Sequence, residues 1–222
     1  MDETKMKKAA VLGTGMVGST IGSKLIQLGY EVKMGSRSAD NAKAAEWVNA
    51  NGEKATQGTF ADASAFGEVI FNCVKGENVL EALKIAGMEN LAGKILIDVS
   101  NPLDFSKGMP PTLLPPLTNT NSLGEEIQKL LPQTHVVKTL NMVNCEVMVE
   151  ASKCGGDATM FISGNSKEAK KEVEHILHQF GWNDIIDLGG INHARSTEMM
   201  LPLWLSIYMA TNNGYVGFKI VR

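Results

Sequence analysis

The chain has 222 residues, of which 20% are charged, and a formal net charge of −3 at pH 7. This length is enough for one α/β domain with a large core, or for one domain with an extension. The basic residues are scattered, and no face combines aromatic with basic residues. We therefore do not expect the protein to bind nucleic acid.

Cysteine usage and hydropathy predict the compartment. The three cysteines, Cys73, Cys145 and Cys154, are an odd number without metal-ligand spacing, so we expect a reducing cytoplasm and no metal site. The polar segment 1–8 predicts no signal peptide. The densest apolar run, residues 199–209, is too short to cross a membrane, so no membrane association is expected.

A glycine-rich turn follows the first expected strand, residues 9–12. In the pattern Gly-x-Gly-x-x-Gly, Gly13 allows a tight strand-to-helix turn and Gly15 lets a pyrophosphate approach the backbone. Gly18 lets the following helix, expected at 19–28, pack close to the strand, and the helix N-terminus favours an anion. The pattern predicts a dinucleotide site made by Gly13, Thr14, Gly15, Met16, Val17 and Gly18.

The end of the second expected strand, residues 30–34, predicts which dinucleotide binds. NAD-binding folds place an acidic residue here for the ribose 2′-hydroxyl, but this chain has Gly35-Ser36-Arg37-Ser38. A hydroxyl and a guanidinium suit a 2′-phosphate, so NADP(H) is the predicted cofactor. Ser38 is also expected to cap a helix at 39–50, with Asp40 in its first turn. The candidate contacts are Ser36, Arg37, Ser38 and Lys43.

Alternating strands and helices continue along the chain. This order predicts an α/β fold with a doubly wound, mostly parallel Rossmann sheet. Five of the prolines fall between Pro102 and Pro116 and predict a long irregular loop. Expected strands are 53–58, 69–74, 94–99, 135–140, 159–163 and 184–188, and expected helices are 61–66, 78–85, 124–131 and 166–180. We expect a single domain over 1–222, with residues from about 190 to 222 as a C-terminal helical extension.

Ligands of such sheets lie across the carboxyl ends of the strands. This rule adds the loops after three further strands to the predicted cofactor site. Their candidate residues are Val74, Lys75, Ser100, Asn101, Pro102, Thr139 and Asn141.

These motifs resemble the deazaflavin-dependent NADP oxidoreductase family and, more distantly, the cytoplasmic domain of six-transmembrane ferric reductases. The glycine turn is followed at the right distance by Gly35-Ser36-Arg37, and residues 136–141 resemble the family's sixth strand and nicotinamide loop. The tail, from Arg195 through Glu198 and Pro202-Leu203 to residues 213–220, resembles the family's C-terminal helix and closing loop. The resemblance covers essentially the whole chain.

The resemblance implies an enzyme that holds NADPH and a second planar ring face to face. Hydride transfer between two such rings needs little acid–base help, and no catalytic dyad is visible, so no catalytic residue is assigned. Asn141 stands where the family has a histidine, and the segment 103–117 has no counterpart. The acceptor therefore stays open between a deazaflavin, a flavin, a quinone-like compound, a metal chelate and a small carbonyl or imine.

The last helix, expected at 198–209, is apolar on nearly every face. A helix of this kind needs cover on all sides, which could come from the core of its own domain. Because the resemblance implies a homodimer, we expect instead that one face packs on the sheet and the other on a second subunit. Glu198 and Pro202, four residues apart, would share a face near the acceptor pocket, where Met199, Met200 and Met209 would form an adaptable wall. The predicted substrate contacts are Asn141, Glu198, Pro202 and Leu203.

Two other functions fit the same sequence. One is an NADP-dependent reductase of a small carbonyl or imine, although its known families have a longer helical C-terminal domain than this chain has room for. The other is a redox sensor that binds NADP(H) without turnover.

Overall fold

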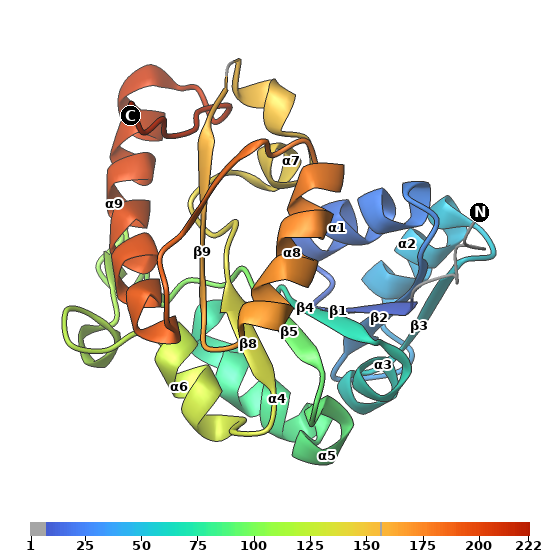
Figure 1. The fold of residues 1–222 in the computed structure, drawn as a ribbon. Helices are drawn as coiled ribbons and strands as arrows, with labels where there is room; N and C mark the ends of the chain where they lie inside the picture. The colour runs from blue at the N-terminus through green and yellow to red at the C-terminus, as the bar shows by residue number, and fades with distance from the viewer. Residues whose placement is uncertain (1–7, 156) are drawn as a thin grey trace.

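A computed structural model describes residues 8–155 and 157–222. The polar start of the chain, on which the prediction of no signal peptide was made, lies largely outside the described residues. An eight-stranded sheet with the order β10-β9-β8-β5-β4-β1-β2-β3 forms the centre of the molecule (Figure 1). Its strands are β1 (Lys8–Leu12), β2 (Glu31–Ser36), β3 (Ala55–Thr59), β4 (Val69–Asn72), β5 (Ile95–Asp98), β8 (His135–Lys138), β9 (Thr159–Gly164) and β10 (Asp184–Asp187).

Helices cover both faces of this sheet (Figure 1). One apolar cluster joins one set of strand side chains to α1, α2, α7 and α8, and a second cluster joins the opposite set to α3, α4, α5 and α6. The helices are α1 (Met16–Gln27), α2 (Ala42–Asn51), α3 (Phe60–Phe66), α4 (Val79–Ala86), α5 (Met88–Leu91), α6 (Leu123–Leu130), α7 (Cys145–Val149), α8 (Lys167–Gln179) and α9 (Ala194–Thr211).

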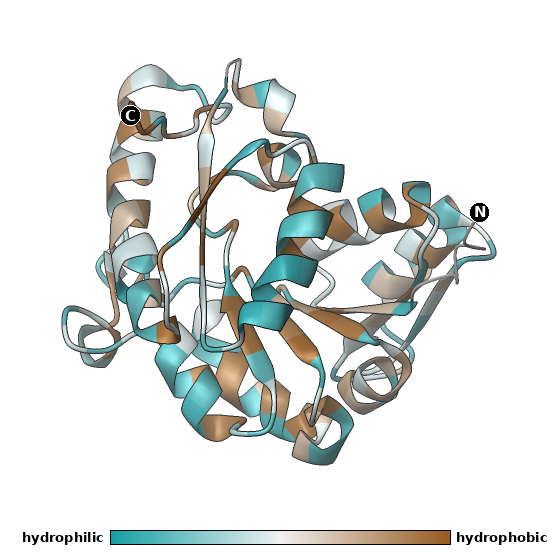
Figure 2. Cartoon of the chain, in the orientation of Figure 1, coloured by the Kyte–Doolittle hydropathy of each residue, from teal (hydrophilic) through white to brown (hydrophobic). Residues whose placement is uncertain are grey.

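The central strands are apolar along their length because both of their faces are covered. Figure 2 shows them as hydrophobic segments, whereas α8 carries a hydrophilic outer side. The described residues of β1 after Lys8 are all fully buried, and so are Ile70 and Phe71 of β4. This pattern is typical of a doubly wound sheet and places the functional surface at the strand ends.

The predicted α/β class and mostly parallel sheet are confirmed, with one local difference in direction. The strands β1, β2, β3, β4, β5 and β8 are parallel, but β9 pairs antiparallel with β8, and β10 is parallel to β9. The connection from β8 to β9 contains only the short α7 and a 3₁₀ turn, Ala151–Cys154. This connection brings the chain back in the opposite direction without a full crossover helix.

Three predicted helix starts were wrong, including that of the last helix, α9, which begins at Ala194 rather than at residue 198. Helix α1 begins at Met16 rather than at residue 19, because its N-cap is Gly15 within the glycine turn. Helix α2 begins at Ala42 rather than at residue 39, and its cap is Asn41, whose side chain accepts a hydrogen bond from the Ala44 amide. Ser38 and Asp40 therefore belong to the loop that precedes α2.

The proline-rich segment contains more structure than the predicted irregular loop. Strands β6 (Leu103–Asp104) and β7 (Thr112–Leu113) pair antiparallel, and a 3₁₀ turn, Pro115–Leu117, follows them. The Leu114 amide also donates to the Pro102 carbonyl at 2.8 Å. The segment is therefore a hairpin that stands beside the carboxyl end of β5.

The C-terminal extension is helical only as far as Thr211. After α9 the chain returns over β9 as an extended tail, in which the Phe218 carbonyl accepts a hydrogen bond from the Thr159 amide at 2.7 Å. Lys219 and Arg222 bind the Asp184 carboxylate at 2.8 and 2.6 Å. Among the described residues, no helix is both long and apolar enough to cross a membrane.

Candidate functional site

A cleft of about 930 Å³ lies over the carboxyl ends of β1, β2, β4, β5 and β8. This is the edge of the sheet at which doubly wound folds bind ligands. From the predicted site the cleft brings together Gly13, Thr14, Gly15, Met16, Val17, Ser36, Arg37, Val74, Lys75, Ser100, Asn101 and Asn141.

The glycine turn shapes the middle of the cleft. Gly13 has a φ of +116°, and a Cβ there would lie 2.7 Å from the Cys73 carbonyl oxygen, so only glycine fits between β1 and β4. A Cβ on Gly18 would collide with the Gly13 carbonyl, which explains the close packing of α1 on the turn. A Cβ on Gly15 would meet only open space, because this residue faces the cleft.

The N-terminus of α1 faces the same space. No side chain caps the helix and its first turn has no acidic residue, so its first amides and the positive end of its dipole are available to an anion. The glycine turn and the helix end together form a cradle that fits a pyrophosphate.

The end of β2 supplies the polar groups of one wing of the cleft. Arg37 is exposed, and within residues 8–155 and 157–222 its guanidinium has no ion-pair partner. The Ser36 hydroxyl donates to the Ser38 carbonyl at 2.5 Å and so shapes the turn that presents Arg37. Asn41, which the sequence analysis did not select, also lines this wing.

Several predicted residues lie outside the cleft lining. Ser38 is exposed beyond the turn, and Lys43 is exposed on α2. Thr139 is fully buried, and its hydroxyl donates to the Phe161 carbonyl at 2.8 Å rather than to the cleft. Pro102 is buried beneath the hairpin, with its carbonyl bound by Leu114. Gly18 is buried in the first turns of α1.

The loops after β4 and β5 lie in direct contact. A Cβ on Gly76 would overlap the Asn101 carbonyl, so a glycine is needed where these loops meet. Lys75 binds Glu77 at 2.9 Å and lies 5.4 Å from the centre of the Phe105 ring. Phe105 belongs to the hairpin, which therefore contributes an aromatic wall to the cleft.

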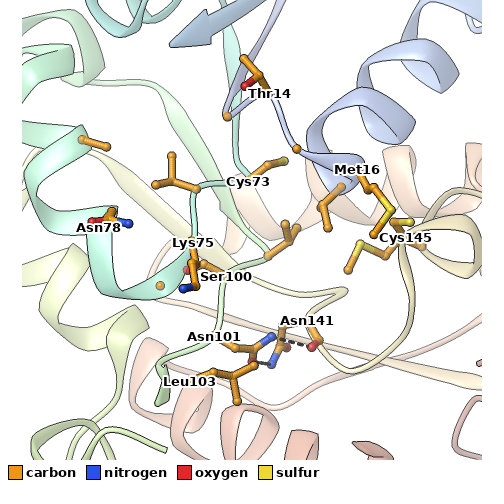
Figure 3. A pocket seen from close by; sticks show the side chains of 18 of the residues that line it. Thr14, Met16, Cys73, Lys75, Asn78, Ser100, Asn101, Leu103, Asn141 and Cys145 are labelled. Atoms are coloured by element: carbon orange, nitrogen blue, oxygen red, sulfur yellow. Dashed lines mark hydrogen bonds between the residues drawn. The ribbon is translucent and has the colours of Figure 1, made fainter. Parts of the chain in front are cut away.

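Asn101 and Asn141, which Figure 3 shows side by side, form a reciprocal amide pair. They follow β5 and β8, whereas Arg37 follows β2 on the other side of β1 and β4 in the sheet. The Asn101 amide donates to the Asn141 backbone carbonyl, and the Asn141 amide donates to Asn101 Oδ1, each at 2.8 Å. Residue Leu140 has a φ of +62°, which is unusual for a leucine and turns the chain sharply before Asn141. The pair ties the loop after β5 to the loop after β8.

A buried ionic cluster supports this pair from below, and the sequence analysis did not identify it. The Lys138 ammonium binds Asp98 and Glu198, each at 2.8 Å, and the Ser100 carbonyl at 2.6 Å. Asp98 also accepts from the Ser100 hydroxyl and from the Asn72 amide. The sequence did contain a signal for this cluster, because Asp98 and Lys138 each end an otherwise apolar strand, and buried charges are usually paired.

The pKa values in this cluster follow from burial and pairing. Burial alone would lower the pKa of Lys138, but Asp98 and Glu198 outweigh it and raise that pKa above its usual value. Burial raises the pKa of Glu198, and the attraction of Lys138 offsets this only in part. The ammonium is therefore held firmly in its charged form.

The predicted substrate contacts on α9 are placed differently from the expectation. Glu198 is 1% exposed and lies outside the cleft lining, because its carboxylate binds Lys138 and accepts from the amides of Leu123 and Gly124. Pro202 and Leu203 also lie outside the lining, and Leu203 is 53% exposed. On the same helix, Leu201 and Trp204 line the cleft instead.

Helix α9 is also less enclosed than the apolar pattern predicted. Trp204 is buried within its own chain, where its indole donates to the Val216 carbonyl at 3.1 Å and stacks on Tyr208. Met199, Leu203 and Met209 are exposed on the helix. One side of α9 is therefore covered by this chain and the other is not.

Cys73, directly after β4, lines the cleft. Burial raises the pKa of this thiol, and the nearby Asp98 carboxylate raises it further. The side chain is accordingly a neutral thiol, which is a poor nucleophile. In the described part of the chain no group of three acidic, histidine or cysteine side chains is arranged to hold a metal ion.

Comparisons with known proteins find one matching family model and a similar crystal structure. The model of the family described as "NADP oxidoreductase coenzyme F420-dependent" matches residues 8–102. A crystal structure of a protein from Arthrobacter sp. FB24, provisionally named an F420-dependent NADP reductase, is 45% identical with a TM-score of 0.92; the match covers 97% of this chain and 100% of that one.

Two sequence relatives carry related names. The F420-dependent NADP reductase of Methanocaldococcus jannaschii is 29% identical over 98% of this chain and 99% of its own length. The metalloreductase STEAP3 of Rattus norvegicus is 30% identical over 89% of this chain, which spans only 38% of that protein.

Proposed function

The chain belongs to the coenzyme F420-dependent NADP oxidoreductase family and is an NADP-dependent oxidoreductase, and from that premise we propose that it transfers a hydride between NADPH and a planar, deazaflavin- or flavin-like acceptor. A deazaflavin is the first choice because the relatives that match this chain over their whole length are named for F420.

The observation that carries the proposal is the continuity of one cleft from Arg37 to Asn141. Its middle is the open pyrophosphate cradle at Gly15, and one wing ends in the exposed Arg37 guanidinium. These groups fit the order of parts in NADP(H), with the 2′-phosphate at β2 and the nicotinamide at β5 and β8. The proposed cofactor contacts are Gly13, Thr14, Gly15, Met16, Val17, Ser36, Arg37, Val74, Lys75, Ser100, Asn101 and Asn141.

The walls at the nicotinamide end suit a flat, largely apolar partner. Leu103 and Phe105 come from the hairpin, and Leu201 and Trp204 come from α9. Val143 and Met148 close the side next to α1. A second ring that enters here would lie against apolar surface on several sides and would exclude water from the first ring.

NADPH supplies the hydride when it is bound, and the side chains of this protein supply position. The amide pair fixes the floor of the cleft, and the buried Lys138 cluster holds the Ser100 backbone beneath it. The hydrophobic walls keep water from the reacting rings. Such positioning accounts for a large part of the rate of a transfer between two bound rings.

The test is NADPH oxidation, followed at the absorbance of the reduced nicotinamide, against a panel of acceptors. The panel contains coenzyme F420, its deazaflavin core without the phosphate tail, riboflavin, FMN, a soluble quinone, an Fe(III) chelate and a cyclic imine. We expect the deazaflavins to give the highest kcat/KM. Turnover of the imine alone would favour the small-substrate reductase, and tight NADPH binding without any turnover would favour the redox sensor.

We also propose that the protein works as a homodimer. The support is the uncovered side of α9, where Met199 and Leu203, four residues apart and so on one face, are 39% and 53% exposed. Apolar side chains grouped on one helix face commonly mark an interface. A partner at this face would lie directly behind Leu201 and Trp204 of the cleft.

A further inference from the structure

The side-chain oxygen of Asn141 is a buried hydrogen-bond acceptor to which no described residue donates. Asn141 is 2% exposed, and within residues 8–155 and 157–222 its Oδ1 has no donor within hydrogen-bond distance. Other buried side-chain oxygens without a partner in the described part of the chain, on Gln57, Ser64 and Ser163, lie away from the cleft. A buried acceptor without a donor is costly, and its place in a ligand cleft calls for an explanation.

The identity of this atom as oxygen follows from its neighbours. The other terminal atom of the Asn141 side chain lies 3.1 Å from the Thr197 carbonyl, which only accepts hydrogen bonds, so that atom must be the NH₂ group. The partner amide is fixed in the same way, because the Asn101 NH₂ faces the Asn141 backbone carbonyl. Rotating either amide by half a turn would bring acceptors against each other.

The backbone holds this orientation. Leu140 adopts a left-handed φ of +62° immediately before Asn141, and the Thr197 carbonyl comes from the first turns of α9. Figure 3 shows Asn101 and Asn141 facing each other across the base of the cleft, joined by the two hydrogen bonds. The loop after β8 and helix α9 thus hold Asn141 in the cleft lining, with its side-chain oxygen buried and, among the described residues, without a hydrogen-bond donor.

We propose that Asn141 Oδ1 accepts a hydrogen bond from the carboxamide NH₂ of the bound nicotinamide and thereby selects the face of the ring that meets the acceptor. This inference rests on the proposed function, because it assumes that NADP(H) runs from Arg37 to Asn141. The carboxamide is the part of the nicotinamide with an N–H donor, and rotation of the ring by half a turn would carry that donor away from Asn141. Asn141 is in this sense a positioning residue for the hydride.

The test compares NADP⁺ with its 3-acetylpyridine analogue, in which a methyl group replaces the NH₂. Binding is measured by calorimetry, so it does not depend on turnover. Wild-type protein is expected to bind NADP⁺ about 3- to 10-fold more tightly than the analogue, in line with one hydrogen bond to a buried acceptor. In Asn141→Ala the two ligands are expected to bind equally, because the acceptor is gone.

The matched control is Asn101→Ala. It disturbs the same amide pair but leaves Asn141 Oδ1 in place, with its NH₂ still bound by Thr197. This variant is expected to weaken both ligands to a similar degree and to keep the preference for NADP⁺.

Three outcomes would overturn the inference. A preference for NADP⁺ that survives in Asn141→Ala would place the carboxamide elsewhere. Equal binding of NADP⁺ and the analogue to the wild-type protein would also show that Asn141 does not accept from the carboxamide. This comparison needs only wild-type protein, so it holds even if Asn141→Ala does not fold. A variant that changes only the KM of the acceptor would assign the oxygen to an N–H of the acceptor. Failure of both ligands to bind wild-type protein would instead contradict the proposed function.

Discussion

The ammonium of Lys138, at the end of β8, binds the carboxylate of Glu198 on α9 at 2.8 Å, and neither side chain is more than 1% exposed. The same ammonium binds Asp98 at the end of β5. One buried lysine therefore joins the last helix to the two strands at the proposed nicotinamide end of the cleft. Because one positive charge serves two buried carboxylates, its removal would leave both of them without a counter-ion.

Lys138→Met is expected to reduce the free energy of unfolding by about 3–5 kcal/mol, because it leaves two carboxylates buried without a counter-ion. Chemical denaturation followed by circular dichroism measures the change. The control is Lys129→Met, which breaks an exposed ion pair with Glu126 on α6 and is expected to cost less than about 1 kcal/mol. Equal stability of the two variants would contradict the role given to the cluster.

Arg37→Ala is expected to weaken NADPH binding about 30- to 150-fold, which corresponds to roughly 2–3 kcal/mol lost from charge-assisted hydrogen bonds to the 2′-phosphate. NADH binding should change little, because NADH has no such phosphate. Fluorescence titration with each cofactor measures both. Lys43→Ala is the control, since Lys43 lies outside the cleft lining. Equal losses for the two cofactors in Arg37→Ala would refute the assignment.

Gly15→Val is expected to abolish dinucleotide binding and leave the fold intact. The open space at the Gly15 Cβ position means that the new side chain displaces no protein atom and instead fills the proposed pyrophosphate site. The melting temperature and NADPH fluorescence on the same sample separate the two effects. Gly18→Val is the contrasting variant, expected to unfold the protein, because its Cβ collides with the Gly13 carbonyl. Undiminished NADPH binding by a folded Gly15→Val would move the cofactor elsewhere.

Leu203→Asp is expected to convert a dimer to a monomer with little loss of monomer stability, since Leu203 is 53% exposed on the uncovered side of α9. Light scattering at several protein concentrations measures the mass. Met88→Asp is the matched control, because Met88 is equally exposed but lies on α5, away from α9. A monomeric wild-type protein, or a dimer that tolerates Leu203→Asp, would exclude this interface.

Docking of the C-terminal tail is expected to weaken in acid. Hydrogen bonds from Lys219 and Thr159, together with Arg222, hold the pKa of Asp184 well below its usual value. The ionised carboxylate therefore contributes stability that is fully present above the unfolded pKa of about 3.9 and is lost as the pH falls towards the lower folded value. The difference in melting temperature between wild type and Asp184→Asn should be largest near pH 7 and shrink below about pH 4. A difference that stays constant down to pH 3 would contradict this linkage.

The local pattern of the sequence determined the fold class and predicted many of the strand-end residues that line the cleft. Apolar runs such as 69–74, and a glycine turn between a strand and a helix, depend on neighbours within a few residues, so their structure follows from spacing and from backbone freedom. The strand ends then follow from the parallel topology, which is why the sequence alone predicts that Gly15, Arg37 and Asn101 lie at one edge of the sheet. The helix starts were misplaced because several residues near each start could act as caps, and only the packed loop selects among them.

The tertiary structure alone decided which side chains meet across long separations. Lys138 and Glu198 lie 60 positions apart, and only their shared burial shows that Glu198 serves an ion pair rather than the acceptor pocket. Three further features depend on which surfaces remain to be buried once the sheet has formed. They are the reversed direction of β9, the hairpin that carries Phe105, and the side of α9 that the chain covers. Burial of charge and of apolar area is a property of the whole packed chain, so no local pattern contains it.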